Sequence, residues 1–95
     1  MILDDLHKTI LQRRQNPVPG SYVSALFEKG RAEILKKIGE EAVEVIIASN
    51  LREKEAIVNE LADLWFHCMV LLAEEGLSHD DIFRELAARH EKKTR

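Results

Sequence analysis

This sequence has a single cysteine, no long uncharged apolar run and no excess of basic residues, and each shortage excludes a class of protein. One thiol, Cys68, cannot form an internal disulfide, and its apolar surroundings are typical of a buried thiol in a reducing compartment. The uncharged stretch at residues 64–73 is half of the ~20 residues that a membrane span requires. No basic segment opens the chain, as it would in a signal peptide. We therefore expect a cytoplasmic protein with no membrane contact.

The overall charge and composition point to one small folded domain. The formal net charge is −3, which argues against general nucleic-acid binding because that requires a basic face. Hydrophobic residues make up 45% of the chain and charged residues 33%, a balance that is typical of a folded and soluble protein. With 95 residues, we expect a single domain over residues 1–95.

Apolar residues recur at helical spacing along most of the chain. No segment shows the alternation of a strand, so the sequence predicts an all-α bundle of four to five helices. The predicted helices cover approximately residues 2–15, 22–29, 31–49 and 53–75, with a last one that begins after residue 78.

Polar caps and glycines mark where these helices begin and end. Ser21 and Ser78 are suitable N-caps, while Gly30 and Gly76 are suitable ends. The segment at residues 16–20 contains two prolines and a glycine, which stop the first helix. We expect the charged tail at residues 90–95 to fray.

Two pairs of acidic residues are the most informative pattern in the chain. Glu41 and Glu44 stand three apart on one long predicted helix, and Glu60 and Asp63 stand three apart on the next. This spacing places both carboxylates of a pair on one helix face. If the two helices pack together, four carboxylates meet and repel one another unless a cation lies between them. Oxygen ligands suit Mg²⁺, and Mn²⁺ could substitute.

The alternative is a solvated helix face whose acids bind nearby lysines, in the pairs Lys36–Glu40 and Lys37–Glu41. Two observations weaken it. Lysine before glutamate is the weaker orientation of such a pair. The acidic strip also lies between two apolar faces on both long helices, so we expect it to be partly desolvated.

Residues beside the acidic strip allow more than one interpretation. His67 follows one turn after Asp63, and a hydrogen-bonded, partly buried imidazole that orients a carboxylate is favoured over a metal ligand because Mg²⁺ prefers oxygen. Lys36 and Lys37 are either surface charges or phosphate contacts. Tyr22 either packs against the protein or stacks on a base, and the sequence alone does not decide.

The helix predicted at residues 53–75 is apolar on nearly every side between residues 64 and 73. A chain of 95 residues has few elements with which to cover it. We therefore expect a homo-oligomer, in the form of a two-fold dimer that completes the bundle. The residues expected at its seam are the apolar positions opposite the main stripe of each helix: Val43, Ile47, Phe66 and Val70.

These segments resemble the phosphoribosyl-ATP pyrophosphatase family of histidine biosynthesis, which belongs to the all-α, MazG-like nucleotide pyrophosphohydrolases. The resemblance covers nearly the whole chain. The superfamily signature is matched by Glu40-Glu41-x-x-Glu44 and Glu60-x-x-Asp63. The narrower match consists of Ser21-Tyr22, Gly30, Lys36-Lys37-x-Gly39-Glu40-Glu41-Ala42-x-Glu44, Ala62-Asp63-Leu64-x-Phe66-His67, Val70-Leu71-Leu72 and Glu85-Leu86-x-x-Arg89-His90. Phe66 departs from the pattern, since a tyrosine commonly precedes the histidine in this family.

The resemblance implies hydrolysis of phosphoribosyl-ATP to phosphoribosyl-AMP and pyrophosphate with Mg²⁺. It assigns the metal to four carboxylates: Glu41, Glu44, Glu60 and Asp63. Glu40 is then the candidate to orient or deprotonate a water, and Lys37 the candidate to offset charge on the departing phosphates. Candidate substrate-binding residues are Tyr22, Lys36 and Lys37.

Two other functions stay open. One is a house-cleaning pyrophosphohydrolase of the same superfamily that acts on dCTP or damaged nucleoside triphosphates. The other is a non-catalytic helical interaction module whose acids are only surface charge. The matches around Tyr22 and His67 favour the histidine-pathway enzyme over the first alternative.

Overall fold

The computed structural model describes residues 1–92, and in these residues every regular element is a helix. The all-α prediction is therefore confirmed, and each expected helix is present within about two residues of its predicted bounds. The five helices are α1 (Ile2–Gln15), α2 (Tyr22–Lys29), α3 (Arg31–Asn50), α4 (Lys54–Glu74) and α5 (His79–Glu91).

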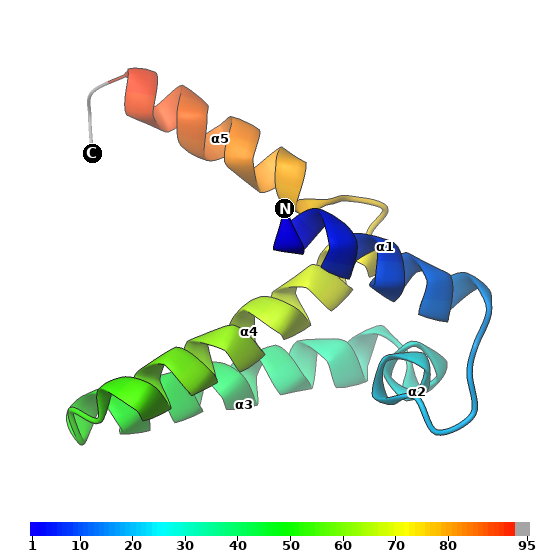
Figure 1. Cartoon of the computed structure of the whole chain (residues 1–95), viewed down its shortest axis with the longest axis horizontal. Coiled ribbons are helices and arrows are strands. Elements are labelled where there is room, and N and C mark those ends of the chain that lie inside the picture. Colours follow the sequence, from blue (N-terminus) through cyan, green and yellow to red (C-terminus); the bar gives the residue numbers. More distant parts are fainter. Residues whose placement is uncertain (93–95) are drawn as a thin grey trace.

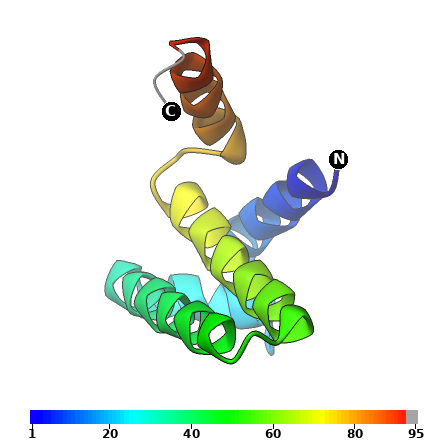
Figure 2. The same cartoon turned by 90° about the vertical axis from the view of Figure 1, so that its left-hand side faces the viewer.

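The two longest helices, α3 and α4, form an antiparallel hairpin joined by a short turn (Figures 1 and 2). α2 lies at the end of the hairpin where α3 begins, and α1 crosses the C-terminal half of α4. α5 contacts α1 near its own start and then points away from the hairpin in both views. The interface between α3 and α4 is the most extensive in the molecule, and it brings the two acidic strips together.

The predicted caps are present at the helix ends. The Ser21 hydroxyl accepts a hydrogen bond from the backbone N–H of Ser24, and Ser78 forms a reciprocal capping box with Asp81. Gly30 joins α2 to α3 with φ 101° and ψ 178°, a conformation that a side chain would strain. This one residue sets the direction of α2 relative to α3, and so the position of Tyr22.

The fraying expected from residue 90 onward does not begin there, because α5 continues through Glu91. Basic residues Arg89 and His90 in the last turn favour this extension through the helix dipole. The end of the predicted tail, residues 93–95, lies outside the described residues.

The apolar core lies where α1, α2 and the start of α3 meet the second half of α4. Its buried members are Ile10, Leu26, Ile34, Met69, Val70 and Ala73. Arg14 ties α1 to α4, since its guanidinium donates to the backbone carbonyls of Ala73 and Glu74 at 3.2 and 3.4 Å. Ser24 ties the loop before α2 to α1 by accepting from the Val18 N–H and donating to the Arg13 carbonyl. These contacts hold α2 against the hairpin.

The predicted dimer seam is wrong in part. Val70 is 0% exposed and belongs to the core of the single chain, and Phe66 packs against that core. The stripe that the sequence assigned to the core is instead only half-buried, and two of its residues are exposed, Trp65 by 55% and Leu61 by 37%. α1 and α2 pack on the face of α4 that carries Phe66 and Val70. Much of the face that carries Leu61 and Trp65 is therefore left open. On α3, Val43 and Ile47 are exposed in the single chain, so their place at a seam stays a prediction.

α4 is long and apolar enough to cross a membrane, judged by length and composition alone. Its 21 residues include an 18-residue window with a mean hydropathy of 1.4. The uncharged stretch at residues 64–73 therefore underestimates the apolar length of this helix. One such helix is weak support for a membrane span, because the core helix of a folded domain can have the same composition. Here α4 also carries Glu60, Asp63 and His67, which are costly in lipid.

Candidate active site

The α3–α4 hairpin brings three of the four predicted metal ligands into one cluster. Each of Glu41, Glu60 and Asp63 offers a carboxylate oxygen, and these three atoms lie within 4.8 Å of one another. Glu41 comes from α3 and the other two come from α4. Acids from α3 and acids from α4 therefore meet at one place.

Glu44, the fourth predicted ligand, lies beside this group, and its charge acts on Glu60. The pKa of Glu60 is raised above its usual 4.5, first by burial and then by the negative charges of Asp63, Glu44 and Glu41. A raised pKa means that ionising Glu60 in this place is unfavourable. The four acids thus form one electrostatic unit, called the carboxylate cluster below, that has an excess of negative charge.

Lys37 lies along one edge of the carboxylate cluster. Its ammonium nitrogen is 3.2 Å from Glu40 Oε2 and 3.5 Å from Glu41 Oε1. Lys36 Nζ is 3.9 Å from Glu40 Oε1. The hydrogen bond to Glu40 is the main cause that raises the pKa of Lys37. The lysine pairs expected for an ordinary helix face are therefore present, but they engage α3 only, and among the described residues Glu60 and Asp63 of α4 have no salt bridge.

Glu40, which the resemblance assigned to orienting or deprotonating a water, is not part of the group of three. Its carboxylate is held by Lys36 and Lys37 on the exposed side of α3. Lys37 nevertheless touches both Glu40 and Glu41, so the candidate water-activating residue and the carboxylate cluster share one cation.

Tyr22 and His67 form a contact that the sequence did not reveal. The Tyr22 hydroxyl oxygen is 2.7 Å from His67 Nε2, and His67 Nδ1 is 2.7 Å from the backbone oxygen of Asp63. His67 is buried, as expected for a hydrogen-bonded imidazole, but its ring binds the backbone of Asp63 and not the carboxylate. The Phe66 ring stacks on Tyr22 with centroids 6.2 Å apart. Tyr22 therefore packs against the protein on one side while remaining half exposed on the other.

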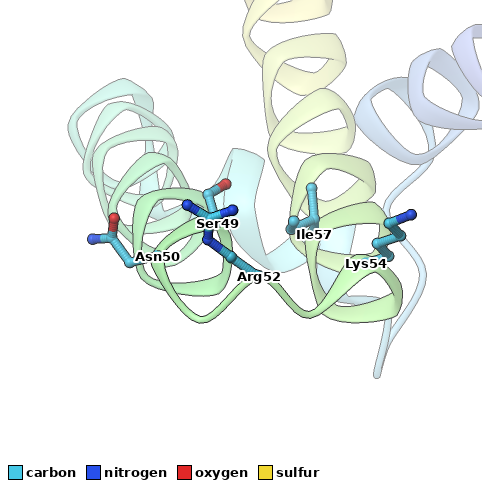
Figure 3. A pocket seen from close by; sticks show the side chains of 5 residues that line it. All are labelled: Ser49, Asn50, Arg52, Lys54 and Ile57. Carbon is cyan, nitrogen blue, oxygen red and sulfur yellow. The ribbon is translucent and has the colours of Figure 1, made fainter.

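A cavity of about 470 Å³ lies at the turn between α3 and α4, away from the predicted site residues (Figure 3). Figure 3 shows its side chains coming from the ends of both helices and from the turn: Ser49, Asn50, Arg52, Lys54 and Ile57. Arg52 adopts φ 56°, which is the left-handed conformation that closes this turn. The cavity is open and contains no acidic side chain, so it does not extend the carboxylate cluster.

A second group that combines a histidine with acids lies where α5 meets α1. His79 Nε2 is 2.8 Å from Asp4 Oδ1, and Asp80 Oδ1 is 3.9 Å away. The hydrogen bond from buried His79 lowers the pKa of Asp4. This contact fastens the start of α5 to α1. No spacing in the sequence connects residues 4 and 79, so no local pattern predicts this contact.

The fold and the cluster together define an all-α protein with carboxylates from two neighbouring helices gathered at one place. A family described as phosphoribosyl-ATP pyrophosphohydrolase matches residues 3–90. The chain belongs to this family, whose members are hydrolases.

Similar curated proteins carry the name phosphoribosyl-ATP pyrophosphatase. The protein from Bacillus cereus strain B4264 is 49% identical over 90 residues, which cover 95% of this chain and 84% of the relative. The protein from Pelotomaculum thermopropionicum is 53% identical over 93 residues, which cover 98% of this chain and 95% of the relative. A Bacillus anthracis protein is 50% identical over 90 residues, with 95% and 84% covered. The resemblance inferred from the motifs is thereby confirmed.

Proposed function

We propose that this chain hydrolyses phosphoribosyl-ATP to phosphoribosyl-AMP and pyrophosphate, the second step of histidine biosynthesis. The observation that carries the proposal is the meeting of Glu41, Glu60 and Asp63 across α3 and α4 in a chain of this family. A triphosphate is itself strongly negative, so it can approach these acids only if cations lie between the two.

The residues present fit a divalent cation. Three carboxylate oxygens within 4.8 Å of one another provide the hard oxygen ligands that Mg²⁺ and Mn²⁺ prefer. The raised pKa of Glu60 reflects an unbalanced negative charge that a cation would relieve. Glu41, Glu44, Glu60 and Asp63 would hold the ion. When bound, Mg²⁺ would neutralise phosphate charge and make a bound water more acidic.

Lys37 and Glu40 would act at the edge of the cluster. In the free protein Lys37 neutralises Glu40 and Glu41. An arriving phosphate would compete for the ammonium groups of Lys37 and Lys36, and Glu40 would then be released to accept a proton from the attacking water. Lys37 would offset the charge that develops on the departing pyrophosphate.

The chain would work as a homodimer in the cytoplasm, with no nucleic-acid or membrane partner. Its radius of gyration is 14.9 Å, larger than the about 12 Å expected for one compact domain of this length. An apolar groove between α4, α5 and the start of α1 supports the same conclusion, and it includes Trp65, Ile82, Phe83 and Leu86. A second copy on this surface would cover these side chains and the open face of α4.

A substrate panel tests the proposed function and separates it from its rivals. Phosphoribosyl-ATP, ATP, dCTP and an oxidised nucleoside triphosphate are offered to the same preparation with Mg²⁺, and pyrophosphate release is measured. We expect phosphoribosyl-ATP to be preferred. Preference for dCTP or the oxidised nucleotide would identify a house-cleaning enzyme, and no turnover of any nucleotide would favour the interaction module.

A further inference from the structure

The direction of the hydrogen bonds around His67 can be deduced from its partners. His67 Nδ1 lies 2.7 Å from the backbone carbonyl oxygen of Asp63. A carbonyl oxygen can only accept, so Nδ1 must carry the proton. In a neutral imidazole the other nitrogen, Nε2, then has a lone pair and can only accept. The contact with Asp63 thus selects one tautomer of the ring.

This tautomer sets the direction of the next hydrogen bond. Nε2 lies 2.7 Å from the Tyr22 hydroxyl, so the phenol must donate its proton to the ring. The pKa of Tyr22 is raised, chiefly by burial, which keeps that proton on the phenol at neutral pH. With its only proton directed at His67, the phenolic oxygen presents lone pairs to its remaining surroundings. It can accept a hydrogen bond from a ligand but cannot donate one.

The Tyr22 oxygen is placed where a ligand of the site would meet it. His67 links this phenol to the backbone of Asp63, a residue proposed for the metal, through two contacts of 2.7 Å, and the charges of Lys37 and Glu41 also act on it. Tyr22 is 49% exposed, while His67 behind it is 5% exposed. The stacked Phe66 ring limits rotation of the tyrosine ring. The hydroxyl is therefore held by its hydrogen bond to His67, and about half of the Tyr22 residue is open to solvent.

We propose that Tyr22 is a specificity-determining residue that accepts a hydrogen bond from an N–H or O–H donor of the nucleotide, and that His67 is the positioning residue that enforces this direction. Non-bridging phosphate oxygens at neutral pH are acceptors and cannot satisfy Tyr22. The donor is therefore a ribose hydroxyl or an N–H of the base. This inference rests on the proposed function for the identity of the nucleotide, while the direction of the bond rests only on the contacts of His67.

Nitrogen-15 NMR of the histidine rings tests the direction without any turnover. In spectra recorded at pH 8 we expect His67 Nδ1 to carry a proton and Nε2 to carry none, and the signals are assigned by their loss in His67→Gln. Tyr22→Phe should shift the Nε2 signal because it removes the donor. A ring protonated on both nitrogens, or on Nε2 alone, would overturn the inference, since Tyr22 would then be free to donate.

Kinetics with phosphoribosyl-ATP test the contact with the substrate. Tyr22→Phe keeps the stacked ring and removes only the oxygen, so we expect KM to rise roughly two- to tenfold with little change in kcat. His67→Phe should give a similar rise in KM, because the freed phenol no longer presents only lone pairs. Thr9→Val, which removes an exposed hydroxyl elsewhere on the surface, is the control and should leave KM unchanged.

Deoxyribose analogues distinguish the two sources of the donor. If a ribose hydroxyl is the donor, the penalty of Tyr22→Phe disappears with the analogue that lacks that hydroxyl. If the base is the donor, the penalty persists with every deoxy analogue. An unchanged KM in Tyr22→Phe, or a loss confined to kcat, would contradict the proposed contact. Failure of the unmodified protein to turn over phosphoribosyl-ATP would instead contradict the proposed function, and the NMR result would still decide the direction.

Discussion

Glu41 on α3 and Glu60 on α4 face each other across the helix hairpin, with carboxylate oxygens within 4.8 Å. Their mutual repulsion, together with that of Glu44 and Asp63, contributes to the raised pKa of Glu60, for which burial is the larger cause. A protein that keeps such an arrangement carries a local instability in the absence of a cation. This relationship has consequences for stability, turnover and metal dependence that can be measured separately.

The stability of the metal-free protein should depend on pH through Glu60. Because its folded pKa lies above the usual 4.5, its contribution to stability is fully present below about pH 4.5 and is lost as the pH rises through the raised value. We expect the melting temperature of the unmodified protein to fall relative to that of Glu60→Gln between about pH 4 and pH 7. Thermal melts in EDTA check this. Parallel curves for the two proteins would show that Glu60 is not destabilised by ionisation.

Loss of a cluster carboxylate should reduce turnover without unfolding the protein. Glu44→Gln and Asp63→Asn preserve side-chain shape but remove a charged oxygen ligand. We expect each to lower kcat by at least about 10–100-fold, while the circular dichroism spectrum stays helical. Glu28→Gln, an exposed carboxylate on α2, is the matched control and should turn over normally. Near-normal turnover in either cluster variant would remove that residue from the ligand set.

We now predict the dimer interface on the face of α4 that is exposed in the single chain. Trp65→Glu places a charge on the exposed stripe of α4, and because Trp65 is 55% exposed the single chain should still fold. We expect light scattering to give a dimer for the unmodified protein and a monomer for Trp65→Glu. Ile47→Glu tests the exposed face of α3, which the sequence assigned to the seam, and it should remain dimeric if the groove beside α4 forms the interface. The reverse pattern would locate the interface on α3, and a monomeric unmodified protein would contradict the dimer.

Ser24 should be important for stability although it takes no part in the chemistry. It is buried, and its hydroxyl serves both the Val18 N–H and the Arg13 carbonyl. Ser24→Ala leaves both backbone groups without that partner, so we expect a loss of about 1–3 kcal/mol in the free energy of unfolding. Urea denaturation measures it. The exposed Ser49→Ala serves as the reference, and equal stability of the two variants would show that water replaces the hydroxyl at no cost.

The sequence predicted the parts of this molecule that depend on local spacing. Ser21, Gly30, Gly76 and Ser78 mark helix ends because capping is decided within a few residues. The carboxylate pairs were found for the same reason, since i, i+3 spacing fixes a helix face.

What the sequence did not predict depends on which faces meet in three dimensions. The sequence assigned Val70 to an interface between copies, but Val70 lies in the core of the single chain. The reason is that α1 and α2 pack on the face of α4 that carries it. The Tyr22–His67 hydrogen bond joins α2 to α4 and follows from the direction that Gly30 gives to α2. The Asp4–His79 contact likewise joins helices from opposite ends of the chain.

Phosphorus-31 NMR of phosphoribosyl-ATP hydrolysis, with Mg²⁺ and then with EDTA, tests the central claim most directly. The claim is that carboxylates from α3 and α4 hold a divalent cation that the reaction requires. It predicts pyrophosphate and phosphoribosyl-AMP as products with Mg²⁺, no products in EDTA, and recovery when Mg²⁺ is restored in excess. Undiminished release of pyrophosphate by the metal-free protein in EDTA would contradict it.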